Sequence, residues 1–222
     1  TDQMLDSPTN NFCTLNPLSA YNAPVLSEGN LKTVGQGTAS YRINTGTFGV
    51  NSGKHYFEAC FKGSLSSENA SVGITTQSFA QDINNSYLGQ GATEWAVLLD
   101  DPNVVAKSGA GSFTGYGDTW ADADVYMLAF DVDTQSLWLG KNGTWYASGN
   151  PSTGANAAFT NLTTGATFYP ATSMLNSDTL VLNFGQDSSF AGNKTAQGNA
   201  DGNGYGDFYY TPPTGFLALC TQ

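Results

Sequence analysis

The length of the apolar runs is the feature of this sequence that most constrains its fold, because every run is short and is bounded by turn-forming residues. Val125–Val132 is an almost unbroken apolar run, as expected of a central strand, and Ser136–Lys141 follows it after a short turn. The two runs predict a β-hairpin. His55–Lys62 alternates as a strand does, whereas no segment longer than two turns has the 3.6-residue period of a helix. The pattern predicts a β-sandwich.

Other short runs lie between clusters of Gly, Asn, Asp and Ser. We expect strands at Ala39–Asn44, Ser71–Thr75, Trp95–Leu99, Thr179–Phe184 and Gly215–Cys220. One short helix is expected over Ser78–Ile83, with Ser78 as its N-cap. Asn142-Gly143 suits a type I′ turn, because both central residues of that turn need positive φ.

The charge balance excludes several classes of protein. The 222 residues include only 7 Lys and Arg against 18 Asp and Glu, for a net charge of -11. So few cations leave no basic surface for nucleic acid, and no apolar run approaches the 18 residues of a membrane span. An aromatic content of 13% argues against disorder. We expect one all-β domain over residues 1–222. Its core lies at about 38–190, between an N-terminal extension at 1–37 and a C-terminal loop and closing strand at 191–222.

The apolar side chains of the first 35 residues, which Pro8, Pro17 and Pro24 interrupt, are expected to cover a sheet edge. The three cysteines, Cys13, Cys60 and Cys220, match no zinc spacing. They are expected to be buried thiols, with one bridge tying down a terminus as the alternative.

The sequence contains few of the residues that catalytic sites commonly use, with a single histidine. Any Ser-His-Asp or Cys-His arrangement must use His55, the single histidine, which lies inside a strand-like run and is expected to be structural. A pair of carboxylates for glycoside cleavage is the open alternative, with Glu58, Glu94, Asp118 and Asp131 among the candidates. No cofactor is expected.

A loop near the C-terminus places oxygen-bearing side chains at alternate positions between glycines, in the sequence Asp201-Gly202-Asn203-Gly204-Tyr205-Gly206-Asp207. Hard oxygen donors on tight turns are what Ca²⁺ prefers, so Asp201, Asn203 and Asp207 are candidate calcium ligands. A plain loop is the alternative, because the spacing departs from the EF-hand pattern and no Glu closes it.

Aromatic side chains in polar loops are the main functional candidates. Trp120 follows Tyr116 and Asp118 in an Asp/Gly/Thr-rich loop, Trp145 and Tyr146 follow the Asn142-Gly143 turn, and Tyr87 precedes another strand. Rings beside amides and hydroxyls suit sugar recognition, since a ring stacks on the apolar face of a sugar. The alternative is that these rings fill the core. The predicted binding residues are Tyr87, Tyr116, Asp118, Trp120, Trp145 and Tyr146.

Seven landmarks, in order, resemble the SPRY domain. They are Gly53-Lys54-His55-Tyr56-Phe57-Glu58, Val72-Gly73-Ile74, Gly115-Tyr116-Gly117-Asp118, Val125–Val132, Leu137-Trp138-Leu139-Gly140-Lys141-Asn142-Gly143, Tyr169-Pro170-Ala171 and Val181-Leu182-Asn183-Phe184-Gly185. The resemblance implies a concanavalin-like sandwich of two bent antiparallel sheets. It also implies a non-catalytic interaction module that binds through loops, without a consensus set of binding residues.

The two ends of the chain are also similar to SPRY-containing virion proteins of bacteriophages, often tail-fibre or minor structural components. The similar segments are Met4–Phe12, Asn183–Asp187, Gly206–Tyr210 and Pro212–Cys220. This similarity implies a place on the virion surface and recognition of a host cell-surface glycan or protein, with a homotrimer as the expectation for fibres. The alternatives are a structural component, a capsid decoration or fibre spacer that binds neighbouring virion proteins, and a polysaccharide-degrading enzyme.

Overall fold

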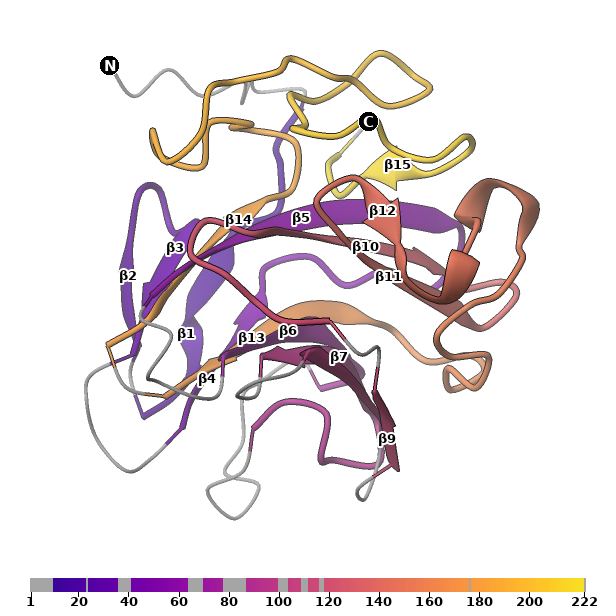
Figure 1. Cartoon of the computed structure of the whole chain (residues 1–222), viewed down its shortest axis with the longest axis horizontal. Helices are drawn as coiled ribbons and strands as arrows, with labels where there is room; N and C mark the ends of the chain where they lie inside the picture. The colour runs from indigo at the N-terminus through magenta and orange to yellow at the C-terminus, as the bar shows by residue number, and fades with distance from the viewer. Residues whose placement is uncertain are drawn as a thin grey trace.

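The computed structural model describes residues 10–22, 24–35, 41–63, 70–77, 87–99, 104–108, 112–115, 118–175 and 177–221. Two sheets pack face to face as a β-sandwich, as predicted (Figure 1). One has the strand order β1-β4-β13-β6-β7-β8-β9. The other has the order β12-β11-β10-β5-β14-β3-β2, with β15 paired to β5. Every strand pair is antiparallel except β15 with β5.

The strands are short, as the sequence pattern requires. Their bounds are β1 Leu15–Tyr21, β2 Val25–Ser27, β3 Lys32–Val34, β4 Arg42–Gly46, β5 Lys54–Lys62, β6 Ala70–Thr75, β7 Glu94–Leu99, β8 Val104–Ser108, β9 Ser112–Gly115, β10 Val125–Asp131, β11 Ser136–Lys141, β12 Thr144–Trp145, β13 Tyr169–Met174, β14 Thr179–Asn183 and β15 Leu217–Ala218. Two 3-10 turns, Tyr146–Ser148 and Pro151–Thr153, are the helices of the described part of the chain, and neither could span a membrane.

All eight expected strands are found, with boundaries that differ by a few residues. The expected helix over Ser78–Ile83 lies outside the described residues. The segment 15–34 was expected to cover a sheet edge but instead extends both sheets. β1 is the edge strand of the seven-stranded sheet, and the hairpin of β2 and β3 is the edge of the other.

The surroundings of β10 explain why its sequence is apolar from Val125 to Phe130. Tyr126, Leu128 and Phe130 face the inner core between the two sheets. Val125 and Met127 face the opposite way and are also buried, each in a cluster on the outer side of the sheet. A strand with both faces buried needs apolar residues at every position.

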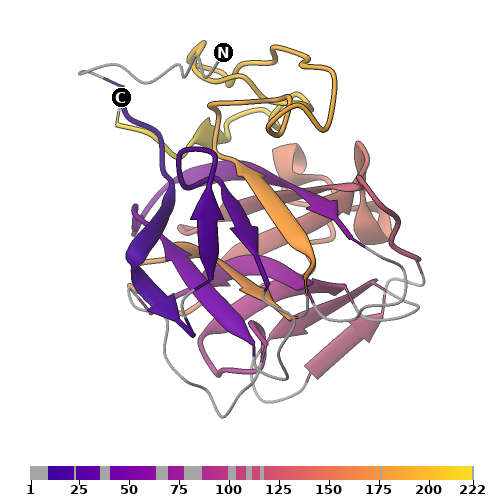
Figure 2. The same ribbon diagram turned by 90° about the vertical axis from the view of Figure 1, so that its left-hand side faces the viewer.

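The outer side of the eight-stranded sheet is covered by residues 185–221, called here the C-terminal layer (Figures 1 and 2). The layer is almost entirely irregular, yet its apolar side chains are buried against the sheet. Phe208, Phe216 and Ala218 pack on Tyr56, Met127, Ala129 and Trp138, and Phe190 packs on Cys60, Val125 and Val181. The sandwich therefore has a third layer, which contributes core residues.

β15 fills a gap that β14 leaves beside β5. Asn183, the last residue of β14, pairs with Glu58, and β15 takes the vacated place beside His55 and Tyr56. The two ends of the chain also pair, because Phe12 bridges Cys220 and the Cys13 N–H donates to Leu219 O at 2.8 Å.

The three cysteines are not joined in disulfides. Cys13 and Cys60 are buried, as expected, and Cys220 is half-buried. Cys13 belongs to the inner core. Cys220 instead packs against the outer cluster, as does Phe12, with which it forms an isolated β-bridge through the backbone. The two thiols near the termini therefore face opposite layers, which explains why the alternative of a bridge between them is not realised.

Candidate functional site

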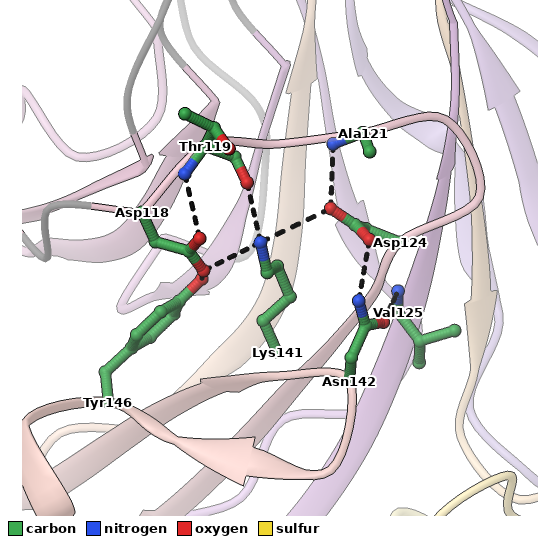
Figure 3. A network of polar contacts seen from close by, with 8 residues as sticks. All are labelled: Asp118, Thr119, Ala121, Asp124, Val125, Lys141, Asn142 and Tyr146. Atoms are coloured by element: carbon green, nitrogen blue, oxygen red, sulfur yellow. Dashed lines mark hydrogen bonds and ion pairs between the residues drawn. The ribbon is translucent and has the colours of Figure 1, made fainter.

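A network of polar contacts joins loop 118–124 to the hairpin of β11 and β12 at one end of the sandwich (Figure 3). Its centre is Lys141, the last residue of β11. The Lys141 ammonium lies 2.7 Å from Asp118 Oδ2 and 3.5 Å from Asp124 Oδ2, and it donates to Thr119 O at 2.6 Å. One cation thus holds three groups of the loop in place.

Asn142 forms the second connection between loop and hairpin. Its amide nitrogen donates to Asp124 Oδ1 at 2.7 Å, and its amide oxygen accepts from the Val125 N–H at 2.9 Å. Asn142 has φ of 50° and Gly143 has φ of 82°, and Lys141 pairs with Thr144 across them. Both central residues of the turn have positive φ, as the sequence predicted.

Asp118 is the partly exposed carboxylate of this network. Burial raises its pKa, but the hydrogen bond and charge of Lys141 outweigh that effect. Together with the Thr119 N–H and the Tyr146 hydroxyl, which donates to Asp118 Oδ2 at 3.2 Å, they hold the Asp118 pKa below its ordinary value. The carboxylate is therefore ionised at neutral pH and suited to accepting hydrogen bonds, whereas a general acid needs a raised pKa.

The structure brings only some of the six predicted binding residues together. Asp118 and Tyr146 are in contact, and Trp145 is half-buried on the other side of the same hairpin, 6.4 Å from the ring of Tyr56. Tyr87 packs edge-on against Tyr41, with ring centroids 5.7 Å apart, in the loop before β7. Tyr116 lies outside the described residues.

The prediction that Trp120 presents an exposed ring for binding is wrong, because the side chain is buried. Only 5% of Trp120 is exposed, and its ring packs edge-on against Phe61 in the inner core at 5.1 Å. The loop folds back over the end of the sandwich and uses this side chain to close it. Trp120 is thus a core residue and contributes no contact surface.

The carboxylates considered for glycoside cleavage each have structural partners. Glu58 accepts four hydrogen bonds while wholly buried, and Glu94 accepts the N–H groups of Gly89 and Gly91. Asp131 accepts the N–H groups of the following turn and lies 3.6 Å from the Lys54 ammonium. These contacts fix loops and turns. The His55 ring is hydrogen bonded to Ser52 O at 2.9 Å, and burial lowers its pKa.

The candidate calcium ligands are engaged within the protein. Asp201 Oδ1 accepts the N–H groups of Asn203 and Tyr205, and Asp201 Oδ2 accepts the Ala218 N–H. Asp207 accepts from the Ser188 hydroxyl and the Gly198 N–H. The described residues contain no group of three or more His, Cys, Asp or Glu side chains placed to hold a metal. The turn at 201–205 is therefore explained by Asp201 itself, and calcium binding stays a prediction.

Two features of this region have no distinctive sequence pattern. Lys141 stands within a structural motif of the family, and the signal that marks it is the rarity of cations in a chain with 7 Lys and Arg. The adjacent tyrosines Tyr209 and Tyr210 are the second feature. Their position beside the hairpin depends on the path of the C-terminal layer, which has no periodic pattern.

The fold and this surface define a class of protein: an all-β sandwich that presents polar and aromatic side chains on connecting loops. The chain belongs to the SPRY domain family, whose model matches residues 54–187. SPRY domains are protein-interaction modules and are generally non-catalytic.

Comparison with solved structures gives the same fold. The SPRY domain of human HERC1 is similar with a TM-score of 0.58 and 17% identity, over 76% of this chain and 96% of that one. The PSpry domain of TRIM65 is similar with a TM-score of 0.54 and 14% identity, over 78% of this chain and 90% of that one. No curated protein sequence matches the chain.

Proposed function

We propose that this chain is a non-catalytic binding module of a bacteriophage virion appendage and that it holds a host surface receptor on the end formed by loop 118–124 and the β11–β12 hairpin. The observation that carries the binding surface is the Lys141 network, which joins two loops into one rigid unit. Fixed loops bind with little loss of conformational entropy. The virion context, including a surface location and a trimeric fibre, is supported by the similarity of both chain ends to phage virion proteins.

The side chains on the outside of this surface are suited to a partner of low charge. Thr119, Asn142 and Thr144 are exposed, and the carboxylates behind them are paired with Lys141. Recognition would therefore rest on shape and hydrogen bonds. The net charge of -11 repels anionic surfaces and limits unspecific attachment to them.

Charge insertion at exposed threonines tests the surface. We expect Thr119→Lys and Thr144→Lys to abolish retention of the protein on host cells while leaving the unfolding temperature unchanged. The matched control is Thr164→Lys, at an exposed residue of the loop 160–167. The Leu162 N–H of this loop donates to Gln135 O, at the other end of β10 and β11.

Three outcomes separate the candidates. Receptor binding is supported if host cells retain the wild-type protein and the Thr164→Lys control but retain neither Thr119→Lys nor Thr144→Lys. Retention only on purified virion proteins replaces the receptor by a structural role within the particle. Release of soluble sugar from host polysaccharide overturns a non-catalytic function.

A further inference from the structure

The C-terminal layer presents two adjacent tyrosines beside the Lys141 network. The rings of Tyr209 and Tyr210 are edge-on to each other with centroids 4.9 Å apart, and both side chains are half-buried. The Phe190 ring lies 6.1 Å from the Tyr209 ring, and the Lys194 ammonium lies 5.9 Å from the same ring centroid. Each tyrosine thus has packed neighbours and an exposed part.

The backbone of this pair is fixed from beneath by one carboxylate. The Tyr209 N–H donates to Glu58 Oε2 at 2.9 Å, and the Tyr210 N–H donates to Glu58 Oε1 at 2.7 Å. The Tyr209 carbonyl in turn accepts from Asn199 Nδ2 at 2.9 Å. The two rings therefore project from a backbone whose donors and acceptor are held on both sides.

Fixing this backbone with the Glu58 carboxylate costs folding free energy, because burial disfavours a charged group. The side chain is wholly buried, and burial raises its pKa to about 7, against the opposing effect of the four hydrogen bonds that it accepts. Well-packed apolar residues are often at least as stabilising as buried ionic groups. Glu58 provides what an apolar residue cannot, a fixed position for two consecutive backbone N–H groups. Such a cost is expected where geometry matters for function.

The tyrosine pair is continuous with the end surface described above. The Tyr210 ring lies on the turn of the hairpin, where a methyl group added at Gly143 would come within 3.0 Å of Tyr210 Cε1. The charges around this part of the sheet are paired, because the Lys62 ammonium contacts the Asp122 carboxylate and the Lys141 ammonium lies 3.5 Å from Asp124 Oδ2. A surface with balanced charge and fixed aromatic rings favours an uncharged ligand.

We propose that Tyr209 and Tyr210, held by Glu58 and flanked by Lys194 and the Asn142–Gly143 turn, form a stacking surface for an uncharged carbohydrate. The apolar face of a sugar ring packs on aromatic rings, and tyrosine hydroxyls and amides bind its hydroxyl groups. Rings that are already fixed lose little entropy on binding. The inference rests on the proposed function and names the chemical class of the receptor.

The test uses the full chain and immobilised uncharged bacterial oligosaccharides of hexose and N-acetylhexosamine. We expect Tyr209→Ala and Tyr210→Ala each to weaken retention about tenfold or more, the scale of truncating a central binding residue. The matched control is Tyr205→Ala, which removes a ring that is 39% exposed in the neighbouring turn and should leave retention unchanged. Since the interaction is uncharged, added salt should not change the affinity.

Glu58→Gln tests whether the carboxylate positions the rings. We expect weaker retention under conditions where the variant is fully folded. Ile74→Val, in the inner core on β6, serves as the control that lowers stability without touching the surface. Equal retention by Glu58→Gln and wild type would overturn the positioning role.

Failure of this inference is distinguishable from failure of the proposed function. The inference is overturned if no uncharged oligosaccharide is retained, or if both tyrosine variants bind as wild type does. In either case, loss of host-cell retention by Thr144→Lys would still support the receptor-binding end. Absence of host-cell retention by the wild-type protein would overturn the proposed function itself.

Discussion

The backbone N–H of Tyr210 donates to the Glu58 carboxylate at 2.7 Å, across 152 positions of the sequence. The bond joins the central strand β5 to the C-terminal layer, with Tyr209, Asn183 and Tyr56 as the other donors to the same carboxylate. All four partners are donors, so they suit the ionised carboxylate, while burial favours the neutral one. Because burial outweighs the four donors and raises the Glu58 pKa, protonation of Glu58 links pH to the stability of this layer.

Glu58 is expected to lower the stability of the fold as the pH rises. Burial raises its pKa from 4.5 to about 7, so the native state binds the proton more tightly than the unfolded chain does. Its contribution is complete below pH 4.5 and is lost as the pH rises through 7, at a cost of about 3 kcal/mol. Urea unfolding of wild type and Glu58→Gln at pH 4.5, 6 and 8 measures this, since other titrating groups cancel. A constant difference between the two proteins across these pH values would contradict the assignment.

Trp120 is expected to matter for stability. Replacing it by alanine leaves a cavity beside Phe61 at the end of the inner core, for which about 3–5 kcal/mol is typical. Trp145→Ala should cost less, because Trp145 is only partly buried. Denaturant unfolding of both variants checks the order. A Trp120→Ala protein that is as stable as wild type but no longer binds would contradict the core role and show that Trp120 contacts the ligand.

Asn142 is expected to be sensitive to a change of charge. Asn142→Gly keeps the positive φ and removes two hydrogen bonds, at a cost of about 1–3 kcal/mol. Asn142→Asp should cost more at pH 7, because it places a second carboxylate against Asp124, to which the amide now donates at 2.7 Å. Added salt should reduce this excess, because it screens the repulsion between the two carboxylates. Thermal unfolding at pH 7 in low and high salt compares the two, and an excess that salt does not reduce would point to a steric cause.

The sheets could be predicted because their residues carry a local pattern. β10 is apolar from Val125 to Phe130 since both of its faces are buried, and the turn after β11 carries the Asn-Gly pair that positive φ favours. The C-terminal layer has neither a period nor long strands. Its burial depends on a few separated side chains, such as Phe208 and Phe216, that meet the sheet only through the path of the chain.

The candidate site was harder to predict than the fold. Trp120 has polar sequence neighbours, but the direction of one side chain within a loop depends on how the loop returns, and here it enters the core. Glu58 occupies an alternate position of β5, which would be a solvent-facing place in a two-layer sandwich. The third layer turns that place into the interior, where the carboxylate becomes a hydrogen-bond acceptor for a distant segment.

The turn at 201–205 tests the calcium prediction. Asp201→Ala removes the acceptor of three backbone N–H groups and should cost about 2 kcal/mol or more. Asn203→Ala keeps the Asn203 N–H that Asp201 accepts but removes an oxygen that an ion would need, and is expected to cost less stability than Asp201→Ala. Without a bound ion, a chelator should leave the unfolding temperature unchanged. A fall on chelation that Asn203→Ala abolishes would establish a calcium site.

The C-terminal layer is expected to be indispensable even though the family model ends at residue 187. Removing residues 188–222 would expose Tyr56, Met127 and Trp138 to water and take away two of the donors to Glu58. Apolar exposure of this kind leads to association, so we expect the shortened chain to aggregate and to bind an apolar dye.

A protease site inserted between Thr195 and Ala196, both exposed, provides the control. A chain cut there keeps the layer in place, because Phe208, Phe216 and Ala218 remain buried against the sheet. The cut protein should therefore stay folded with both fragments bound, as size-exclusion chromatography under native conditions would show. A shortened chain that is monomeric and unfolds cooperatively at the wild-type temperature would show that the layer covers the sheet without stabilising it.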